Sequence, residues 1–167
     1  MEKDDFFVKS QIESNITDIK VLLETGVFSA PILRSFQEPV FVSTILKLND
    51  LLQKFQILDQ RINFDDDINS GDITDLVNKI RNAICHLNSD ENLLDKKARI
   101  KFVFNVAIGK VNVIDANGKT AKSDYNDDIA FFYGEHRIYL KRHILRCLNE
   151  AEETTQRLYT DSEKSNS

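Results

Sequence analysis

Apolar residues recur at helical spacing over long stretches of this chain, and few residues interrupt them. In residues 4–25, Ile12, Ile16 and Ile19 stand three or four positions apart with charged residues between them. Residues 39–60 carry a wider apolar face, which is typical of a central helix packed on more than one side. The 167 residues include two prolines and five glycines. So few helix breakers favour long helices over a sandwich of many strands.

Residues that favour the first turn of a helix indicate where the other helices begin. Pro39 suits the first turn of the second helix, where a missing backbone N–H does no harm. Asp72, with Asp75 three residues later, indicates the N-cap of a third helix over about residues 73–88. Helical spacing returns over residues 137–158, so we expect a last helix there.

The pattern between the third and last helices is different. Residues 100–108 alternate apolar and other side chains at period two, as strands do, and two shorter apolar stretches follow. Asn117-Gly118 is typical of a tight turn, and the polar residues 117–127 are expected to form a mobile loop. We therefore expect a small antiparallel β insertion over about residues 100–135.

These elements predict a mainly α fold. It is an up-and-down helical bundle with a small antiparallel β insertion before the last helix. One domain is expected over residues 1–160, because no linker or internal repeat divides the chain. Residues 161–167 have nothing apolar to bury and are expected to be a disordered tail.

The charge balance narrows the choice of partners. The formal net charge is −5 and the isoelectric point is about 5.2. Proteins that coat nucleic acid are usually basic, so stable nonspecific binding to DNA or RNA and binding to an anionic membrane are not expected. A transient encounter with RNA at a local basic patch stays open.

The sequence also indicates where the protein resides. It has no apolar run of 18 residues and starts with acidic residues rather than a secretory signal. We expect a cytoplasmic protein, with no membrane partner and with Cys85 and Cys147 as reduced thiols.

The most informative stretch lies late in the third predicted helix. It reads Arg81-Asn82-Ala83-Ile84-Cys85-His86. On a helical wheel Arg81 and His86 flank the apolar stripe, roughly 140° apart, with Asn82 between them. One helix is therefore expected to present an Arg, an Asn and a His away from its own core.

This stretch resembles the signature of the HEPN family (higher eukaryotes and prokaryotes nucleotide-binding), which is an Arg, four to six residues and a His, often with Asn after the Arg. The resemblance implies a symmetric homodimer whose two motifs meet in one cleft, and in many members metal-independent cleavage of RNA. It also implies a toxin or phage-defence effector, with an antitoxin or regulatory protein as partner. HEPN toxins silenced by a nucleotidyltransferase often carry a Tyr two residues after the His. Here that residue is Asn88, which puts such regulation in doubt.

The residue types suit this chemistry. RNA carries its own nucleophile, the 2′-OH, so cleavage needs a base, an acid and positive charge on the phosphorane. His86 is the candidate general acid or base, because imidazole titrates near neutral pH. Arg81 is expected to bind the scissile phosphate and Asn82 to orient His86 or the phosphate. No cofactor and no metal are expected.

Other interpretations stay open. The chain could be a non-catalytic HEPN-like module that binds a nucleotide, RNA or a protein, or an antitoxin-like or immunity protein whose acidic surface covers a basic partner. Arg81 and His86 could also be an ordinary solvated helix face. His143 and Cys147 stand four apart, but two residues do not make a metal site.

Basic residues gather in two nearby segments of the chain. In an acidic protein they could attract RNA to one surface, or they could be ordinary charged faces. They are Lys96, Lys97, Arg99 and Lys101 in the first segment, and Arg137, Lys141, Arg142 and Arg146, with His136 and His143, in the second.

Overall fold

The structure is a computed structural model that describes residues 3–165 except 70, 87 and 89. It contains four α-helices, two 3-10 turns (η1 and η2), one π-helical segment (η3) and seven strands within the described residues. The helical elements are α1 (Lys3–Glu24), η1 (Pro31–Leu33), α2 (Arg34–Ile57), α3 (Ile73–Cys85), η2 (Asp90–Asn92), η3 (Leu140–Leu145) and α4 (Arg146–Ser165). The strands are β1 (Leu93–Asp95), β2 (Ile100–Lys101), β3 (Asn105–Ile108), β4 (Val111–Ala116), β5 (Lys119–Ser123), β6 (Ile129–Tyr133) and β7 (His136–Tyr139).

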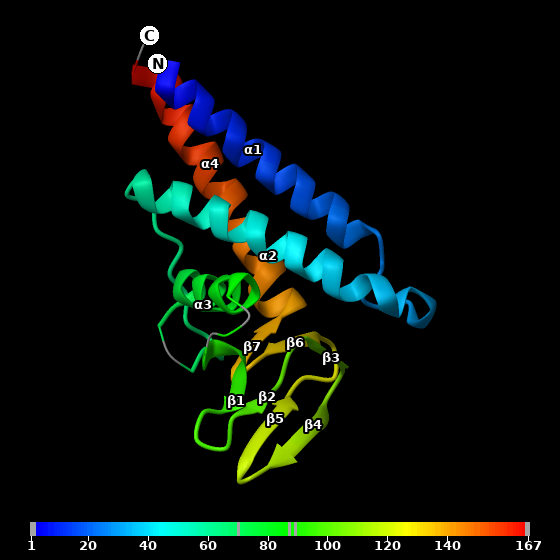
Figure 1. Ribbon diagram of the computed structural model, residues 1–167. Coiled ribbons are helices and arrows are strands. Elements are labelled where there is room, and N and C mark those ends of the chain that lie inside the picture. The colour runs from blue at the N-terminus through cyan, green and yellow to red at the C-terminus, as the bar shows by residue number, and fades with distance from the viewer. Residues whose placement is uncertain (1–2, 70, 87, 89, 166–167) are drawn as a thin grey trace.

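The α-helices form one layer of the molecule. α2 packs against α1 on one side and α3 on the other, and α1 lies beside α4 (Figure 1). The apolar stripes predicted from helical spacing meet here and are fully buried at Ile12, Ile19, Phe41, Leu48 and Ile80. Burial of each such side chain stabilises the fold by about 1.5–3 kcal/mol.

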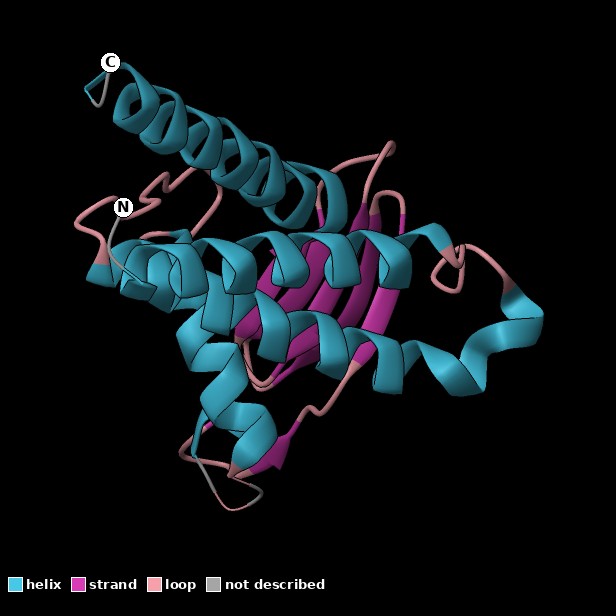
Figure 2. Ribbon diagram, turned by 90° about the horizontal axis from the view of Figure 1, so that it is seen from above, coloured by secondary structure: helices cyan, strands magenta, loops and turns pink. Residues whose placement is uncertain are grey.

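A three-stranded antiparallel sheet lies against the helices, with β6 between β3 and β7 (Figure 2). All five residues of β6 are buried. Phe131 and Tyr133 belong to the cluster shared with the helices, whereas Ala130 and Phe132 belong to a second cluster on the other face. The sheet is therefore covered on both faces.

Two short hairpins cover the face of the sheet that is turned away from the helices. β1 pairs with β2 and β4 pairs with β5, both antiparallel. The second cluster joins these hairpins to the sheet, and its buried members are Leu94, Phe102, Ala107, Ala121, Ala130, Phe132 and Tyr139. The order of layers is helices, sheet and hairpins.

The prediction of a mainly α bundle with a small β insertion is wrong. The β region begins at Leu93 and ends at Tyr139, which makes the fold a mixture of α and β. The insertion expected over 100–135 was too short at both ends, and the polar residues expected to be a mobile loop include β5. Strands of two to six residues give little periodicity, and here pairing with β6 decides the structure.

The predicted helix bounds also need correction. The last helix does not begin at residue 137, because Ile138 and Tyr139 pair with β6 as part of β7. η3 follows, held by the buried Asp128, whose carboxylate accepts the backbone N–H groups of Lys141 and Arg142 at 2.8 and 3.1 Å.

The other helix ends differ less. α2 begins at Arg34, so Pro39 lies inside this helix rather than in its first turn. The predicted disordered tail is helical as far as Ser165, and residues 166–167 lie outside the described part. No helix in the described part of the chain is long and apolar enough to cross a membrane.

Candidate functional site

α3 carries the Arg81–His86 motif, and its start is held by the predicted cap. Asp72 accepts the backbone N–H of Asp75 at 2.9 Å, and the Asp75 carboxylate accepts the N–H of Asp72 in return. Arg61 donates to both carboxylates at 2.8 Å. The capping box is confirmed, and Arg61 ties it to the segment that leads in from α2.

α3 ends earlier than predicted, and this changes where His86 lies. The last helical residue is Cys85, and His86 is the C-cap with φ −122° and ψ 88°, no longer helical. Its backbone N–H still donates to the Asn82 carbonyl at 3.0 Å. The helical wheel therefore applies to Arg81 and Asn82, which are half-buried residues of the helix. It does not apply to His86, which follows the helix and is exposed.

Arg81 is held by a row of side-chain amides. Its guanidinium donates to the Asn82 oxygen at 3.1 Å, and the Asn82 amide donates to Asn78 at 3.1 Å. Asn78 donates in turn to Asn49 of α2 at 3.4 Å. Each amide donates through nitrogen and accepts through oxygen, so the row presents its oxygen end to the Arg81 cation. Hydrogen bonds aligned in this way strengthen one another.

η2 and the start of the β region fix the backbone at His86. The buried Asn92 donates to the His86 carbonyl at 3.0 Å. The backbone carbonyl of Asn92 accepts the N–H of Phe102, and the carbonyl of Phe102 accepts the N–H of Gly134 at 2.6 Å. Gly134 has φ +59°, and a Cβ there would stand 1.8 Å from the Glu91 carbonyl. The close approach of the β6–β7 turn to η2 thus requires glycine.

The sequence singles out Arg81, Asn82 and His86 as a candidate site, which stays a prediction, and does not predict the residues that contact them. The spacing of Asn78 and Asn82, one helical turn apart, was a signal that could have found the first link. Asn49 and Asn92 lie on other elements and carry no local signal. The Cys85 thiol is exposed beside His86.

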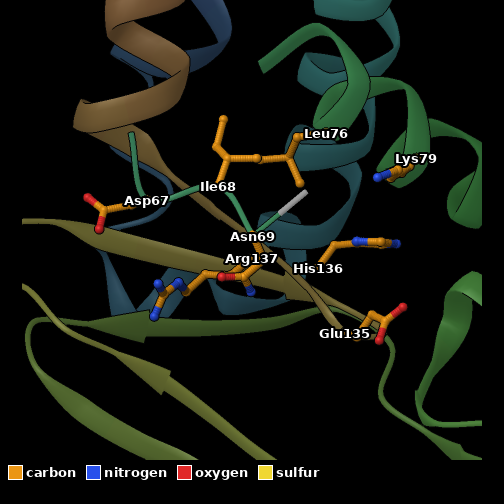
Figure 3. A pocket seen from close by; sticks show the side chains of 8 residues that line it. All are labelled: Asp67, Ile68, Asn69, Leu76, Lys79, Glu135, His136 and Arg137. Carbon is orange, nitrogen blue, oxygen red and sulfur yellow. The ribbon is translucent and has the colours of Figure 1, made fainter. Parts of the chain in front are cut away.

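A pocket of about 250 Å³ opens on another side of α3. Lys79 and His136 point toward one another at one end of this pocket, and Arg137 points away toward the other end (Figure 3). The lining also includes Asp67 and Glu135 and does not include Arg81 or His86. The pocket is therefore not the site of the motif.

One group beside this pocket has donors that could hold a metal ion. The donor atoms of Glu91, Glu135 and His136 all lie within 4.8 Å of one another. His136 already pairs with Glu91, and Lys96 lies 3.9 Å from Glu91 and 3.4 Å from Glu135. Because Lys96 compensates both carboxylates and His136 contacts Glu91, the group is a polar network that joins η2 to the β6–β7 turn.

The three arginines of the second segment pair with carboxylates, whereas Lys141 is exposed and has no ion pair among the described residues. Arg137 pairs with Asp124, Arg142 with Asp127 and the buried Asp128, and Arg146 with Asp66 and Glu150. The pairs of Arg137 and Arg142 join β7 and η3 to the loop before β6, and the pair of Arg146 with Asp66 joins α4 to the loop before α3.

His143 and Cys147 do not form a metal site. His143 is fully buried; its Nδ1 accepts the Tyr139 N–H at 3.1 Å and its Nε2 donates to the Asp66 carbonyl at 2.9 Å. Burial lowers the pKa of His143, which is neutral in this arrangement. Burial raises the pKa of the Cys147 thiol. Both residues are buried parts of the core.

Comparison of the chain with protein-family models, with curated proteins and with solved structures found no match.

Proposed function

We propose that this protein is a metal-independent endoribonuclease of the HEPN type, with an active site assembled from Arg81 and His86 of two copies of the chain. One observation carries the proposal. The end of α3 exposes an imidazole close in sequence to a guanidinium whose hydrogen-bond partner is a neutral amide. Among the described residues no carboxylate pairs with Arg81, so this cation can bind a phosphate without first breaking an ion pair.

The reaction that these groups suit is an internal transfer at phosphorus. A base takes the proton of the 2′-OH, the 2′-oxygen attacks the phosphorus, and the bond to the 5′-oxygen breaks as an acid protonates that oxygen. The products are a 2′,3′-cyclic phosphate and a 5′-OH. His86 supplies the base or the acid, and Arg81 stabilises the negative charge that gathers on the phosphoryl oxygens.

Two copies are needed because one imidazole cannot be base and acid in the same step. His86 is exposed at a helix end, and the adjacent pocket is lined by other residues. A second copy placed against this end supplies a second His86 and a second Arg81, as expected for a symmetric dimer.

The test is cleavage of a mixed RNA pool in EDTA by purified wild type, Arg81→Ala, His86→Ala and the neighbouring control Cys85→Ala. Wild type and the control should cleave and leave cyclic phosphate ends. The two site variants should be slower by about a hundredfold or more, the usual cost of losing a general acid or base. Full activity of His86→Ala would refute the assignment, and no cleavage by wild type would favour a non-catalytic binding module.

We further propose that the activity is that of a toxin or defence effector. Expression of wild type in bacteria should then arrest growth, because cellular RNA is cut. Expression of His86→Ala at the same protein level should not. Growth arrest by both forms would rule out RNA cleavage through His86 as its cause.

A further inference from the structure

The two basic segments found in the sequence differ in the structure. The arginines of the second segment all pair with carboxylates. In the first segment Lys97, Arg99 and Lys101 are exposed, and no ion pair to them is found among the described residues. Among the described residues the first segment therefore presents three exposed cations without an ion pair, and the second presents one, Lys141.

The exposed cations lie on a hairpin turn. Asp95 accepts the backbone N–H groups of Lys97 and Ala98 at 2.8 and 3.0 Å, which shapes the turn between β1 and β2. Lys101 follows in β2, on its exposed side. The Asp95 carboxylate is thus committed to the backbone of the turn rather than to these side chains.

A second turn brings one more cation to the same place. The pKa of Asp95 is lowered by the N–H groups of Ala98 and Lys97 and also by Lys119 and Asn117 of the β4–β5 turn. Both turns lie at the end of the molecule farthest from its termini (Figure 1). We call Lys97, Arg99, Lys101 and Lys119 the basic tip.

The backbone at Arg99 adds a further observation. Its φ is +53°, a left-handed conformation that favours Gly, Asn or Asp over a long side chain. An arginine stands here although glycine would be less strained. A strained residue of this kind is a recognised pointer to function.

The tip is also close to the motif. β1 starts at Leu93, next to the Asn92 side chain that holds the His86 carbonyl. Lys101 of the tip pairs with Leu93 between the two strands, one residue from Asn92. A single nucleic-acid strand bound at the tip can therefore reach the end of α3.

We infer that the basic tip binds the phosphodiester backbone of RNA and so delivers the strand to Arg81 and His86. This inference deepens the proposed function and rests on it. In an acidic protein a local basic surface concentrates a polyanion at one place while the remaining surface repels it. The contacts are to phosphates, so binding is independent of base sequence and falls with salt.

The test is binding of a fluorescently labelled single-stranded RNA to the full chain, measured by anisotropy at several salt concentrations. All proteins carry His86→Ala, so the RNA is not cut. Lys97→Ala/Arg99→Ala/Lys101→Ala should bind at least tenfold more weakly at low salt. The slope of log K against log salt should fall by about 2, since each phosphate contact on a single strand contributes about 0.7.

The matched control is Arg34→Ala/Lys110→Ala/Arg157→Ala, which removes three exposed cations away from the tip. It changes the net charge equally and should bind within about twofold of the parent. Arg99→Gly is a second variant whose two readouts have opposite signs: weaker RNA binding, and a higher unfolding temperature because strain is relieved.

Each outcome bears on one proposal or the other. If the tip variant binds RNA like its parent, or if the parent binds no RNA, the inference is wrong even where wild type cleaves RNA. If wild type cleaves nothing but binding depends on the tip, the proposed function fails and the RNA surface stands. Binding of the tip to phosphatidylserine vesicles without binding to RNA would overturn the inference.

Discussion

At the scale of single residues, the partner of Arg81 decides what this side chain can do. Arg142 and Arg146 are bound to carboxylates, whereas the Arg81 guanidinium is held by the Asn82 oxygen at 3.1 Å. A neutral partner fixes the direction of a guanidinium without cancelling its charge. The amides of Asn82, Asn78 and Asn49 thus keep Arg81 ready for an anion.

Asn82→Asp tests this role of the neutral partner. The new carboxylate would pair with Arg81 and compete with the RNA phosphate, so KM for RNA should rise about tenfold, equivalent to about 1.4 kcal/mol. Asn82→Ala is the matched control: it removes the same contact without adding charge and should raise KM less. Equal kinetics for wild type and Asn82→Asp would contradict the assignment of Arg81 as the phosphate ligand.

His143 predicts a pH dependence of stability. Burial lowers its pKa in the folded state, so the unfolded chain binds more protons below about pH 6.5, the usual value for histidine. The stability due to neutral His143 is complete above that pH and is lost as the pH falls.

The measurement is the free energy of unfolding in urea between pH 7.5 and pH 5. Wild type should lose stability over this range, and His143→Asn should lose less, because asparagine does not titrate. The same slope for both proteins would show that other groups cause the dependence.

The sequence predicts some of these residues and not others for a physical reason. Arg81, Asn82 and His86 lie in one short segment, so a pattern along the chain finds them. Asn49 comes to α3 only because α2 packs there, and Asn92 only because η2 folds back on His86. Contacts made by the fold leave no pattern in the chain.

At the scale of elements, α3 is held at both ends by different devices. Arg61 and the capping box hold its start, and Asn92 holds the residue after its end. Its start was predictable because a capping box is local. Its end was not, since apolar residues at helical spacing continue in the sequence beyond Cys85, whereas the backbone of His86 is already non-helical.

Asp72→Ala should destabilise the fold by about 1–2 kcal/mol, because it removes the N-cap of α3 and leaves Arg61 with only Asp75. Asp72→Asn separates the two effects: asparagine is an equally good N-cap but forms no ion pair with Arg61. The free energy of unfolding in urea should place Asp72→Asn between wild type and Asp72→Ala. An Asp72→Ala protein as stable as wild type would contradict the account of the cap.

At the scale of the whole molecule, the β region is a substantial part of the fold with its own hydrophobic cluster, and not a small insertion in a helical bundle. It covers one face of the sheet with hairpins, anchors His86 through Asn92 and carries the basic tip at its far end. Its extent was underestimated because the strands at its two ends, β1 and β7, have only three and four residues, which is too short to show the alternation that identifies a half-buried strand.

A site shared by two copies predicts that activity depends on protein concentration. On dilution the specific activity should fall as dimers dissociate. The fall should follow the loss of dimer measured by sedimentation at the same concentrations. Constant specific activity in a sample shown to be monomeric would mean that one copy suffices.

The most direct test of the two-copy site is to mix wild type with an increasing excess of His86→Ala. The His86→Ala chain alone should cleave RNA in EDTA at least a hundredfold more slowly than wild type. After subunit exchange most wild-type chains pair with a variant chain, and such a mixed dimer has one imidazole where the reaction needs two, so we predict that cleavage per wild-type chain falls towards the rate of His86→Ala. Unchanged cleavage per wild-type chain, with subunit exchange demonstrated by labelled chains, would contradict an active site assembled from two copies.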